Sequence, residues 1–131
     1  MKQFTFAAVA AIIVAGMGSA SAQDVAAGEK SYAKCRACHQ VGETAKNGVG
    51  PKLNGLFGRV AGSVEGYNYS AANKTSGVTW TEETFAKYIV DPRAFMPGNK
   101  MAFAGIKNET ESANLTAFLK QYNAEGTKSG S

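Results

Sequence analysis

The sequence predicts an all-α fold with three main helices, short additional helices and long loops. Helical signals lie near residues 24–37, 79–91 and 108–123, and no segment shows the alternating apolar and polar residues of a convincing β-strand. The stretches 40–69 and 91–107 are rich in Gly, Asn and Pro, which is typical of loops. The chain has 131 residues, which fits one domain, and its 44% hydrophobic and 18% charged residues exclude a disordered chain or a coiled coil.

The first two helices are predicted from their ends. Asp24 is a suitable N-cap for the first helix, because its side chain can accept from free N–H groups of the first turn. The second helix starts near Thr79–Thr81, and Glu82 and Glu83 favour the positive end of its dipole. Asp91-Pro92 should end it, since the residue before a proline avoids helical geometry. The apolar face of this helix is expected to contain Phe85, Tyr88 and Ile89.

The third helix carries the clearest buried stripe. Asn108, with Glu111 three residues later, resembles a capping box. Apolar side chains then follow at i, i+3, i+4 and i+7, namely Leu115, Phe118, Leu119 and Tyr122. A shorter helix is expected after Ser70. A few short helices and long loops make a poor core for one domain, so either an element is missing from this assignment or a non-protein group fills the middle.

The N-terminus predicts a cleaved secretory signal peptide over residues 1–22. A basic residue is followed by an apolar run from Phe4 to Met17 and by Ala20-Ser21-Ala22, where small residues mark cleavage after Ala22. The run is shorter than the roughly 20 residues that a membrane-spanning helix needs. We therefore expect a periplasmic protein, with one domain over 23–125 and a flexible C-terminal tail over 126–131.

Charge and residue counts exclude several classes of protein. The chain has 14 Lys and Arg against 10 Asp and Glu, and its net charge of +4 falls to +3 when the lysine of the signal peptide is removed. No dense run of basic residues marks a nucleic-acid surface. A single histidine excludes any site that needs two, and two cysteines exclude a four-cysteine zinc or iron–sulfur site within the chain.

Both cysteines and the histidine lie in Cys35-Arg36-Ala37-Cys38-His39. A disulfide between the two cysteines would close a very small ring, where cross-links stabilise least. A thioredoxin-type site needs a preceding strand, and none is predicted. A zinc site would have only three nitrogen and sulfur ligands and would need carboxylates to complete it. The fourth and favoured interpretation is covalent haem attachment, for which C-x-x-C-H is the pattern.

Haem attachment explains the spacing of this motif. Two thiols three positions apart on a helical turn match the two vinyl groups of one haem, and His39 then falls under the iron as a ligand. Covalent attachment occurs in exported proteins, in agreement with the signal peptide. One haem c per chain, held by two thioethers from Cys35 and Cys38, would also complete the core. We therefore expect the apoprotein to be largely unfolded.

The ligand on the other side of the iron decides between classes of function. An open position permits substrate or gas chemistry, whereas a second protein ligand leaves electron transfer. The candidates are Met96 and Met101, the two methionines that follow the signal peptide. A methionine in so small a domain is more often core filler, and the residues alone leave both candidates open. Both lie in a Pro-Gly loop, which can approach an iron face without placing a helix backbone there.

Five ordered motifs are spread over nearly all of residues 24–123. They are Cys35–His39, Gly50–Arg59, Tyr69–Lys74, Gly77–Trp80 and Pro97–Lys107. In order and separation these motifs resemble class I c-type cytochromes of the mitochondrial cytochrome c and bacterial cytochrome c2 kind. The resemblance implies the cytochrome c fold wrapped around a covalently bound haem. It places the ligand methionine at Met101, not Met96, as the axial partner of His39.

The resemblance also implies roles around the haem. The carbonyl of Pro51 accepts from the second nitrogen of the ligand histidine, which fixes the ring. Tyr69 and Trp80 donate to a buried propionate, with Arg59 as the nearby cation. The polar groups implied around the methionine ligand are Asn73, Tyr88 and Asn99. The remaining contacts implied are Phe103 at the exposed haem edge, and Gly28 and Tyr32 with Leu115 and Phe118 where the terminal helices cross.

By the same resemblance the protein is a soluble, monomeric electron carrier and not an enzyme. It would carry electrons from the cytochrome bc1 complex to a photosynthetic reaction centre or a terminal oxidase, with exchange at the edge near Cys38 and Phe103. The expected docking cations are Lys34, Arg36, Arg93, Lys100 and Lys107, and the acidic residues expected on the other side are Asp24, Glu29, Glu109, Glu111 and Glu125. The alternatives are a small haem enzyme, such as a peroxidase or small-ligand reductase with a labile sixth ligand, and a carrier tethered by a retained signal.

Overall fold

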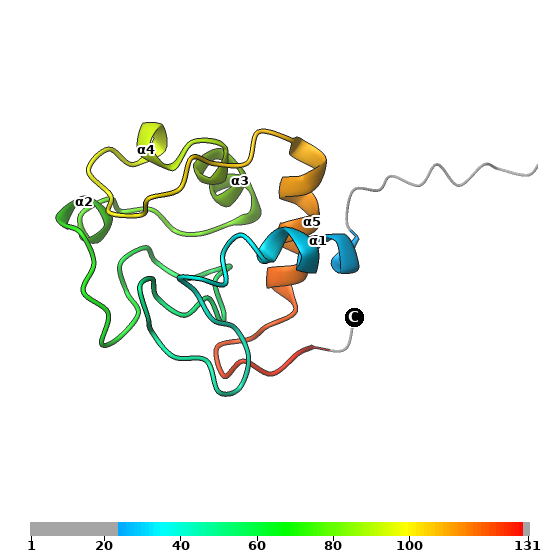
Figure 1. The fold of residues 1–131 in the computed structure, drawn as a ribbon. Helices are drawn as coiled ribbons and strands as arrows, with labels where there is room; N and C mark the ends of the chain where they lie inside the picture. The colour runs from blue at the N-terminus through cyan, green and yellow to red at the C-terminus, as the bar shows by residue number, and fades with distance from the viewer. Residues whose placement is uncertain (1–23, 130–131) are drawn as a thin grey trace, which may run out of the picture.

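The computed structural model describes residues 24–129, so the predicted signal peptide over 1–22 lies outside the described residues. Within that range the helices are α1 (Val25–Tyr32), α2 (Ala71–Lys74), α3 (Glu82–Val90), α4 (Pro92–Phe95) and α5 (Glu109–Lys120). Two isolated bridges, Val60–Thr79 and Tyr122–Lys128, are the only β-type pairings between residues 24 and 129. The predicted all-α class is confirmed (Figure 1). None of the described helices is long and apolar enough to cross a membrane.

Helix α1 begins as predicted but ends earlier. The side chain of Asp24 accepts from the N–H of Ala27 and caps the first turn. The prediction of a helix to residue 37 is wrong, because after Tyr32 the backbone bonds shorten to i→i+3, with Cys35 N donating to Tyr32 O at 2.8 Å. One helical turn then re-forms, in which His39 N donates to Cys35 O at 2.9 Å. This tightening turns the Cys35–His39 motif away from the axis of α1.

Helices α3 and α4 follow each other across Asp91-Pro92. Thr81 and Thr84 form a reciprocal capping box at the start of α3, which ends before Pro92 as expected. The loop prediction for 91–107 is wrong over residues 92–95, which form α4. Asp91 caps α4 by accepting from Ala94 N at 3.2 Å, and Pro92 occupies the first helical position, where a missing N–H is not needed.

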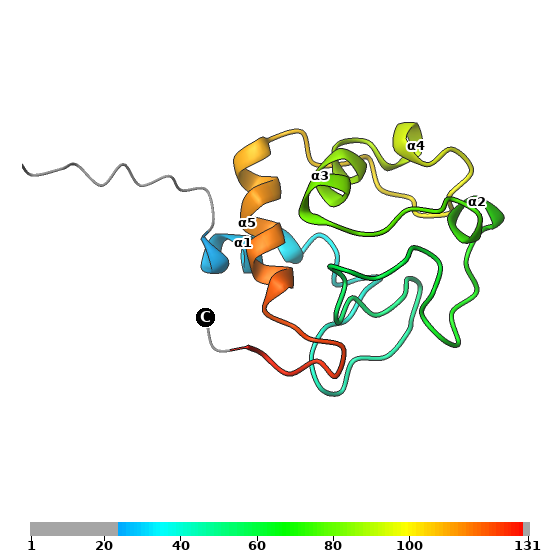
Figure 2. The ribbon, with the colours of Figure 1, turned by 180° about the vertical axis from the view of Figure 1, so that it is seen from behind.

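Helices α1 and α5 cross to form the main packing contact of the fold (Figures 1 and 2). A Cβ added at Gly28 would lie 2.9 Å from the Cβ of Phe118 and would also clash with the backbone of Asn114. The rings of Tyr32 and Phe118 lie 5.0 Å apart between centroids, and Leu115 beside them is 1% exposed. The crossing therefore involves the four residues that the resemblance implied, and it depends on a residue without a side chain at position 28.

The start of α5 shows half of the expected capping box. Asn108 accepts from Glu111 N at 2.9 Å, which satisfies one free donor of the first turn. The carboxylate of Glu111 does not return to the N-cap, because it bonds to Ser31 and Lys34 near the end of α1. Glu111, which was expected to complete the capping box of α5, instead links α5 to the end of α1.

The residues after α5 form a folded turn. The prediction of a flexible tail from residue 126 is wrong for residues 126–129, since Tyr122 pairs with Lys128 and Ser129 N donates to Gln121 O at 2.8 Å. The side chain of Asn123 holds the turn by accepting from two backbone N–H groups. Figures 1 and 2 show this red segment beside the loop that follows the Cys35–His39 motif.

Candidate functional site

One cavity of about 240 Å³ brings together all twelve residues expected around haem. They are Cys35, Cys38, His39, Pro51, Arg59, Tyr69, Asn73, Trp80, Tyr88, Asn99, Met101 and Phe103. Apolar side chains, among them Leu56, Phe85 and Ile89, complete the lining. Met96 is not among the lining residues and is 3% exposed in the core. Of the two candidate methionines, only Met101 lies where it can reach a group held by the cysteines.

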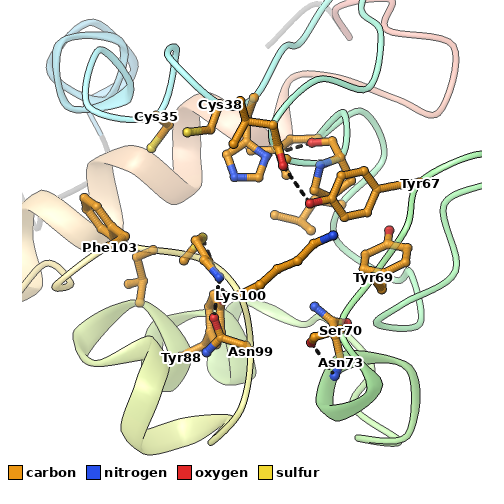
Figure 3. A pocket seen from close by; sticks show the side chains of 18 of the residues that line it. Cys35, Cys38, Tyr67, Tyr69, Ser70, Asn73, Tyr88, Asn99, Lys100 and Phe103 are labelled. Carbon is orange, nitrogen blue, oxygen red and sulfur yellow. Dashed lines mark hydrogen bonds between the residues drawn. The ribbon is translucent and has the colours of Figure 1, made fainter.

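The cysteines and the histidine form one side of the cavity. Cys35 and Cys38 are free thiols, and Figure 3 shows both entering from the same side. His39 Nδ1 lies 2.7 Å from the carbonyl oxygen of Pro51, so Nδ1 is the donor and Nε2 is left to act as a ligand. Burial lowers the pKa of His39, which keeps the ring neutral, as a metal ligand must be.

Gly50 allows the loop to pass close to His39. A Cβ at this position would lie 2.7 Å from Nδ1 of His39, well inside normal contact. The backbone of Gly50 is tied to the Cys35–His39 motif, since its N–H donates to Cys38 O at 2.8 Å. A side chain at position 50 would therefore displace either the imidazole or the carbonyl of Pro51 that orients it.

Met101 and its neighbours form the other side. Asn99 Oδ1 accepts from Met101 N at 2.8 Å, and Asn99 Nδ2 donates to the carbonyls of Pro92 and Met96 at 2.9 Å each. Asn99 therefore fixes the backbone that presents Met101. The hydroxyl of Tyr88 donates to the sulfur of Met101 at 3.6 Å, and burial raises the pKa of Tyr88 to about 12, so this donor stays protonated.

Polar groups gather at a third part of the lining. Arg59 Nη1 donates to the carbonyls of Lys52 and Asn54 at 3.1 Å each, which leaves its other N–H groups for a further partner. The Tyr69 hydroxyl accepts from Val64 N at 3.1 Å and keeps its own proton to donate. Asn73 Oδ1 is buried and has no hydrogen-bond partner within the described part of the chain. Such an acceptor calls for a hydrogen-bond donor, for which an ordered water molecule is suited.

Sequence reasoning missed Tyr67, which closes one edge of the cavity. Its hydroxyl donates to Val49 O at 2.7 Å, and its ring meets that of Tyr69 edge to face at 4.7 Å. Lys100 Nζ lies 4.7 Å from the Tyr67 ring centroid and donates to Asn68 O. Figure 3 shows Lys100 extended towards Tyr67. The alternation Tyr67-Asn68-Tyr69 was the available signal, because alternate residues of an extended segment face the same way.

The charges around the cavity differ from the expected pattern. Lys34 forms an ion pair with Glu111, and Arg36 lies 3.6 Å from Glu29. The prediction that Glu29 and Glu111 face away from the docking cations is therefore wrong, because the crossing of α1 and α5 brings them to the same side. Glu125 lies beyond the end of α5. Between residues 24 and 129, no salt bridge involves the other three docking cations, Arg93, Lys100 and Lys107.

These donors fit haem c. Two thiols, a neutral imidazole and a thioether meet in one cavity with apolar walls, and the remaining N–H groups of Arg59 suit a carboxylate. The model of the Cytochrome c family matches residues 25–123. The chain belongs to the cytochrome c family. It is an electron-transfer protein rather than an enzyme, and its cofactor is covalently bound haem c.

Similar proteins support this assignment. A cytochrome c2 of Blastochloris viridis is 54% identical over 117 residues, which cover 89% of this chain and 92% of that protein. A cytochrome c-550 of Nitrobacter winogradskyi is 57% identical over 103 residues, covering 79% and 94%. The structure of cytochrome c2 from Rhodospirillum centenum matches with a TM-score of 0.73 and 39% identity, over 76% of this chain and 98% of that one.

Proposed function

We propose that the chain is a soluble periplasmic carrier of single electrons, with haem c attached to Cys35 and Cys38 and ligated by His39 and Met101. The observation that carries the proposal is the meeting of the Cys35–His39 motif and Met101 in one cavity, while Met96 is buried elsewhere. When bound, haem c supplies a one-electron iron couple whose potential is raised by His/Met ligation.

The protein's part is to hold both ligands still. His39 is oriented by the carbonyl of Pro51, and Met101 is held through its backbone by Asn99 and through its sulfur by Tyr88. Ligands that are fixed before and after the reaction need little rearrangement. Two protein ligands also leave no open position for a substrate, which is what a carrier needs.

The polar part of the lining would hold the propionates. Arg59 supplies positive charge, and Tyr69 and Trp80 supply donors from the buried lining. A carboxylate in such a place must be hydrogen-bonded or paired. Phe103, Lys34 and Lys100 also line the cavity, which supports their position at the edge where electrons enter and leave.

As physiological partners we propose the cytochrome bc1 complex as donor and a photosynthetic reaction centre or terminal oxidase as acceptor. The similarity to proteins named cytochrome c2 and cytochrome c-550 supports this choice. The partners would dock transiently at the cavity edge, which Lys100 lines. Arg93, Lys100 and Lys107 carry positive charge that no salt bridge of the described part of the chain neutralises. The monomer would meet its partners through a small, salt-sensitive contact.

The axial ligands are tested by optical spectroscopy of Met101→Ala and Met96→Ala. We expect the charge-transfer band of a methionine–Fe(III) bond in the wild type and in Met96→Ala, and its loss in Met101→Ala. A band that survives in Met101→Ala would refute the ligand assignment. Turnover with isolated cytochrome bc1 complex should fall as ionic strength rises, and cell fractionation should place the protein in the periplasm.

A further inference from the structure

The turn that follows α5 closes on itself. Asn123 N donates to Thr127 O at 3.1 Å, and Gly126 N donates to Asn123 O at 2.9 Å. The side-chain oxygen of Asn123 accepts from the N–H groups of Glu125 and Thr127 at 3.1 and 2.9 Å. We call residues 121–129 the C-terminal clasp. Its internal bonds give it a defined shape despite its polar, glycine-containing sequence.

The clasp packs against residues 42–55 of the loop that follows the Cys35–His39 motif. Gly55 N donates to Tyr122 O at 3.1 Å, and a Cβ at Gly55 would lie 2.9 Å from Ala124 Cα. Gly126 is buried, has a φ of +81°, and lies so close to Gly42 that an added Cβ would clash with the carbonyl of Gly42 and lie 2.7 Å from Asn54 Nδ2. The clasp therefore touches the loop at both Gly42 and Gly55.

Those two contact points are tied to each other and to Pro51. Asn54 joins them, because its side chain accepts from Gly42 N and donates to Gly42 O at 2.9 Å each. Leu53 N donates to Gln40 O at 3.0 Å, next to His39. Pro51 lies between this fixed stretch and Gly50, and its carbonyl is 2.7 Å from His39 Nδ1.

From this chain of contacts we infer that the C-terminal clasp is a positioning device for the histidine ligand. It holds the loop from Gly42 to Gly55, and through that loop it holds the carbonyl of Pro51 against His39 Nδ1. The inference rests on the proposed axial role of His39, because only then does the orientation of this ring matter for electron transfer. Residues that never touch the cofactor would thus set the strength of its proximal hydrogen bond.

The inference is tested with Gly126→Ala in the haem-loaded protein. The added methyl group cannot fit between the clasp and Gly42, so the clasp must move away from the loop. The matched control is Gly77→Ala, since Gly77 has a similar φ of +69° but nothing within 4 Å of an added Cβ. Both variants place an alanine at a positive φ and so carry similar backbone strain, but only Gly126→Ala carries the clash.

Hydrogen exchange in the reduced protein gives the readout. In Gly126→Ala we expect exchange of the Gly55 amide and of the His39 Nδ1 proton to be at least tenfold faster than in wild type. In Gly77→Ala both rates should stay within twofold. A weaker His39–Pro51 bond also makes the ligand less basic, so the reduction potential of Gly126→Ala should rise. Faster exchange of the Gly55 amide with an unchanged exchange rate of the His39 Nδ1 proton would overturn the inference. The clasp would then stabilise only the loop that it contacts.

A milder pair of variants decides the matter if Gly126→Ala does not fold. Asn123→Ala removes the side-chain acceptor that shapes the clasp, whereas Asn108→Ala removes the N-cap acceptor at the start of α5, far from the clasp. Only Asn123→Ala should accelerate exchange at His39. Equal acceleration in both would mean that global destabilisation is the cause, and would contradict the inference. The proposed axial ligation is tested separately by the methionine–Fe(III) charge-transfer band of the wild type, which does not depend on the clasp, so the two proposals fail in different experiments.

Discussion

The hydroxyl of Tyr88 lies 3.6 Å from the sulfur of Met101 and donates a hydrogen bond to it. Tyr88 sits near the end of α3, a helix whose N-cap Thr81 and terminator Pro92 fix its register, and its ring packs 4.8 Å from that of Trp80. The position of the Tyr88 phenol is fixed by the backbone of α3 and by packing against Trp80. The contact with Met101 is therefore built into the fold and does not depend on a flexible side chain.

Removal of this donor should lower the reduction potential. A hydrogen bond to the sulfur draws electron density away from it, which disfavours Fe(III) more than Fe(II). In Tyr88→Phe the sulfur becomes a better donor to Fe(III), and a differential of ~0.5 kcal/mol corresponds to a fall of ~20 mV for one electron. Protein-film voltammetry measures this. Tyr67→Phe, which removes a cavity-lining hydroxyl that bonds to Val49 O and not to Met101, is the control. An equal fall in both variants would contradict the assignment.

Docking should depend more on Arg93 than on Arg36. Both are exposed arginines, but Arg36 lies 3.6 Å from Glu29, whereas Arg93 belongs to α4 beside the Met101 loop and is in none of the salt bridges of residues 24–129. At low ionic strength Arg93→Ala should slow the bimolecular reaction with cytochrome bc1 complex about two- to fivefold, and Arg36→Ala should change it less. Stopped-flow kinetics over a salt series tests this, and identical slopes for both variants would contradict it.

Local signals in the sequence predicted most of the fold. Asp24, Thr81 and Asn108 do cap helices, because a cap depends on residues only three positions away. Helix α4 was missed because Pro92 ends one helix and starts the next, and a loop-like composition hides a four-residue helix. The overrun of α1 has a tertiary cause, since the chain leaves helical geometry to turn Cys35 into the cavity.

The spacing of Cys35–His39 predicted haem attachment, and the family resemblance supplied Met101 and the polar residues around the haem. What was missed depends on tertiary geometry. Tyr67 bonds to Val49 O, and the clasp contact joins Gly126 to Gly42, so both connect segments far apart in the chain. The alternation of Tyr67 and Tyr69 indicates that the two rings face the same way, but not what they face. The pairing of Lys34 with Glu111 depends on the angle at which α1 and α5 cross, which composition does not determine. Position on the terminal helices therefore predicted the wrong side for Glu29 and Glu111.

Removal of haem should unfold most of the chain. Without haem, the aromatic and aliphatic side chains that line the cavity would lose their packing partner. Helices α2 and α4 have four residues each, which is too few for a helix to form on its own. In the apoprotein, or in a Cys35→Ser/Cys38→Ser variant that cannot attach haem, the far-UV circular dichroism should lose most of its helical signal. Thermal unfolding of the loaded wild type is the control. An apoprotein with full native helicity would disprove the view that haem completes the core.

Gly28→Ala should destabilise the protein although alanine is the better helix former. Alanine gains about 1 kcal/mol in helix propensity. Its methyl group would lie 2.9 Å from Phe118 Cβ and would also strike the backbone of Asn114, so α1 and α5 must separate. Overpacking of this kind costs roughly 1–3 kcal/mol, and we expect a net loss in the free energy of unfolding. Denaturant titration measures it, with Ala26→Gly on the exposed face as the propensity control. A more stable Gly28→Ala protein would refute the close crossing.

The Glu111–Lys34 pair should make stability fall in acid. The hydrogen bond and charge of Lys34 hold the pKa of Glu111 below its ordinary value of 4.5. The unfolded chain then binds a proton more readily than the folded chain, so the contribution is present above about pH 4.5 and is lost as pH falls through the lower folded value. Glu111→Gln should cost about 0.5 kcal/mol at neutral pH, a usual size for an exposed pair, and should not differ from wild type at low pH. Unfolding free energies measured across the acid range test this.

Glu109→Gln, in the same first turn of α5 but without the contact to Lys34, controls for the helix dipole. A Glu111→Gln curve that runs parallel to wild type at every pH would show that the pair contributes no charge-dependent stability.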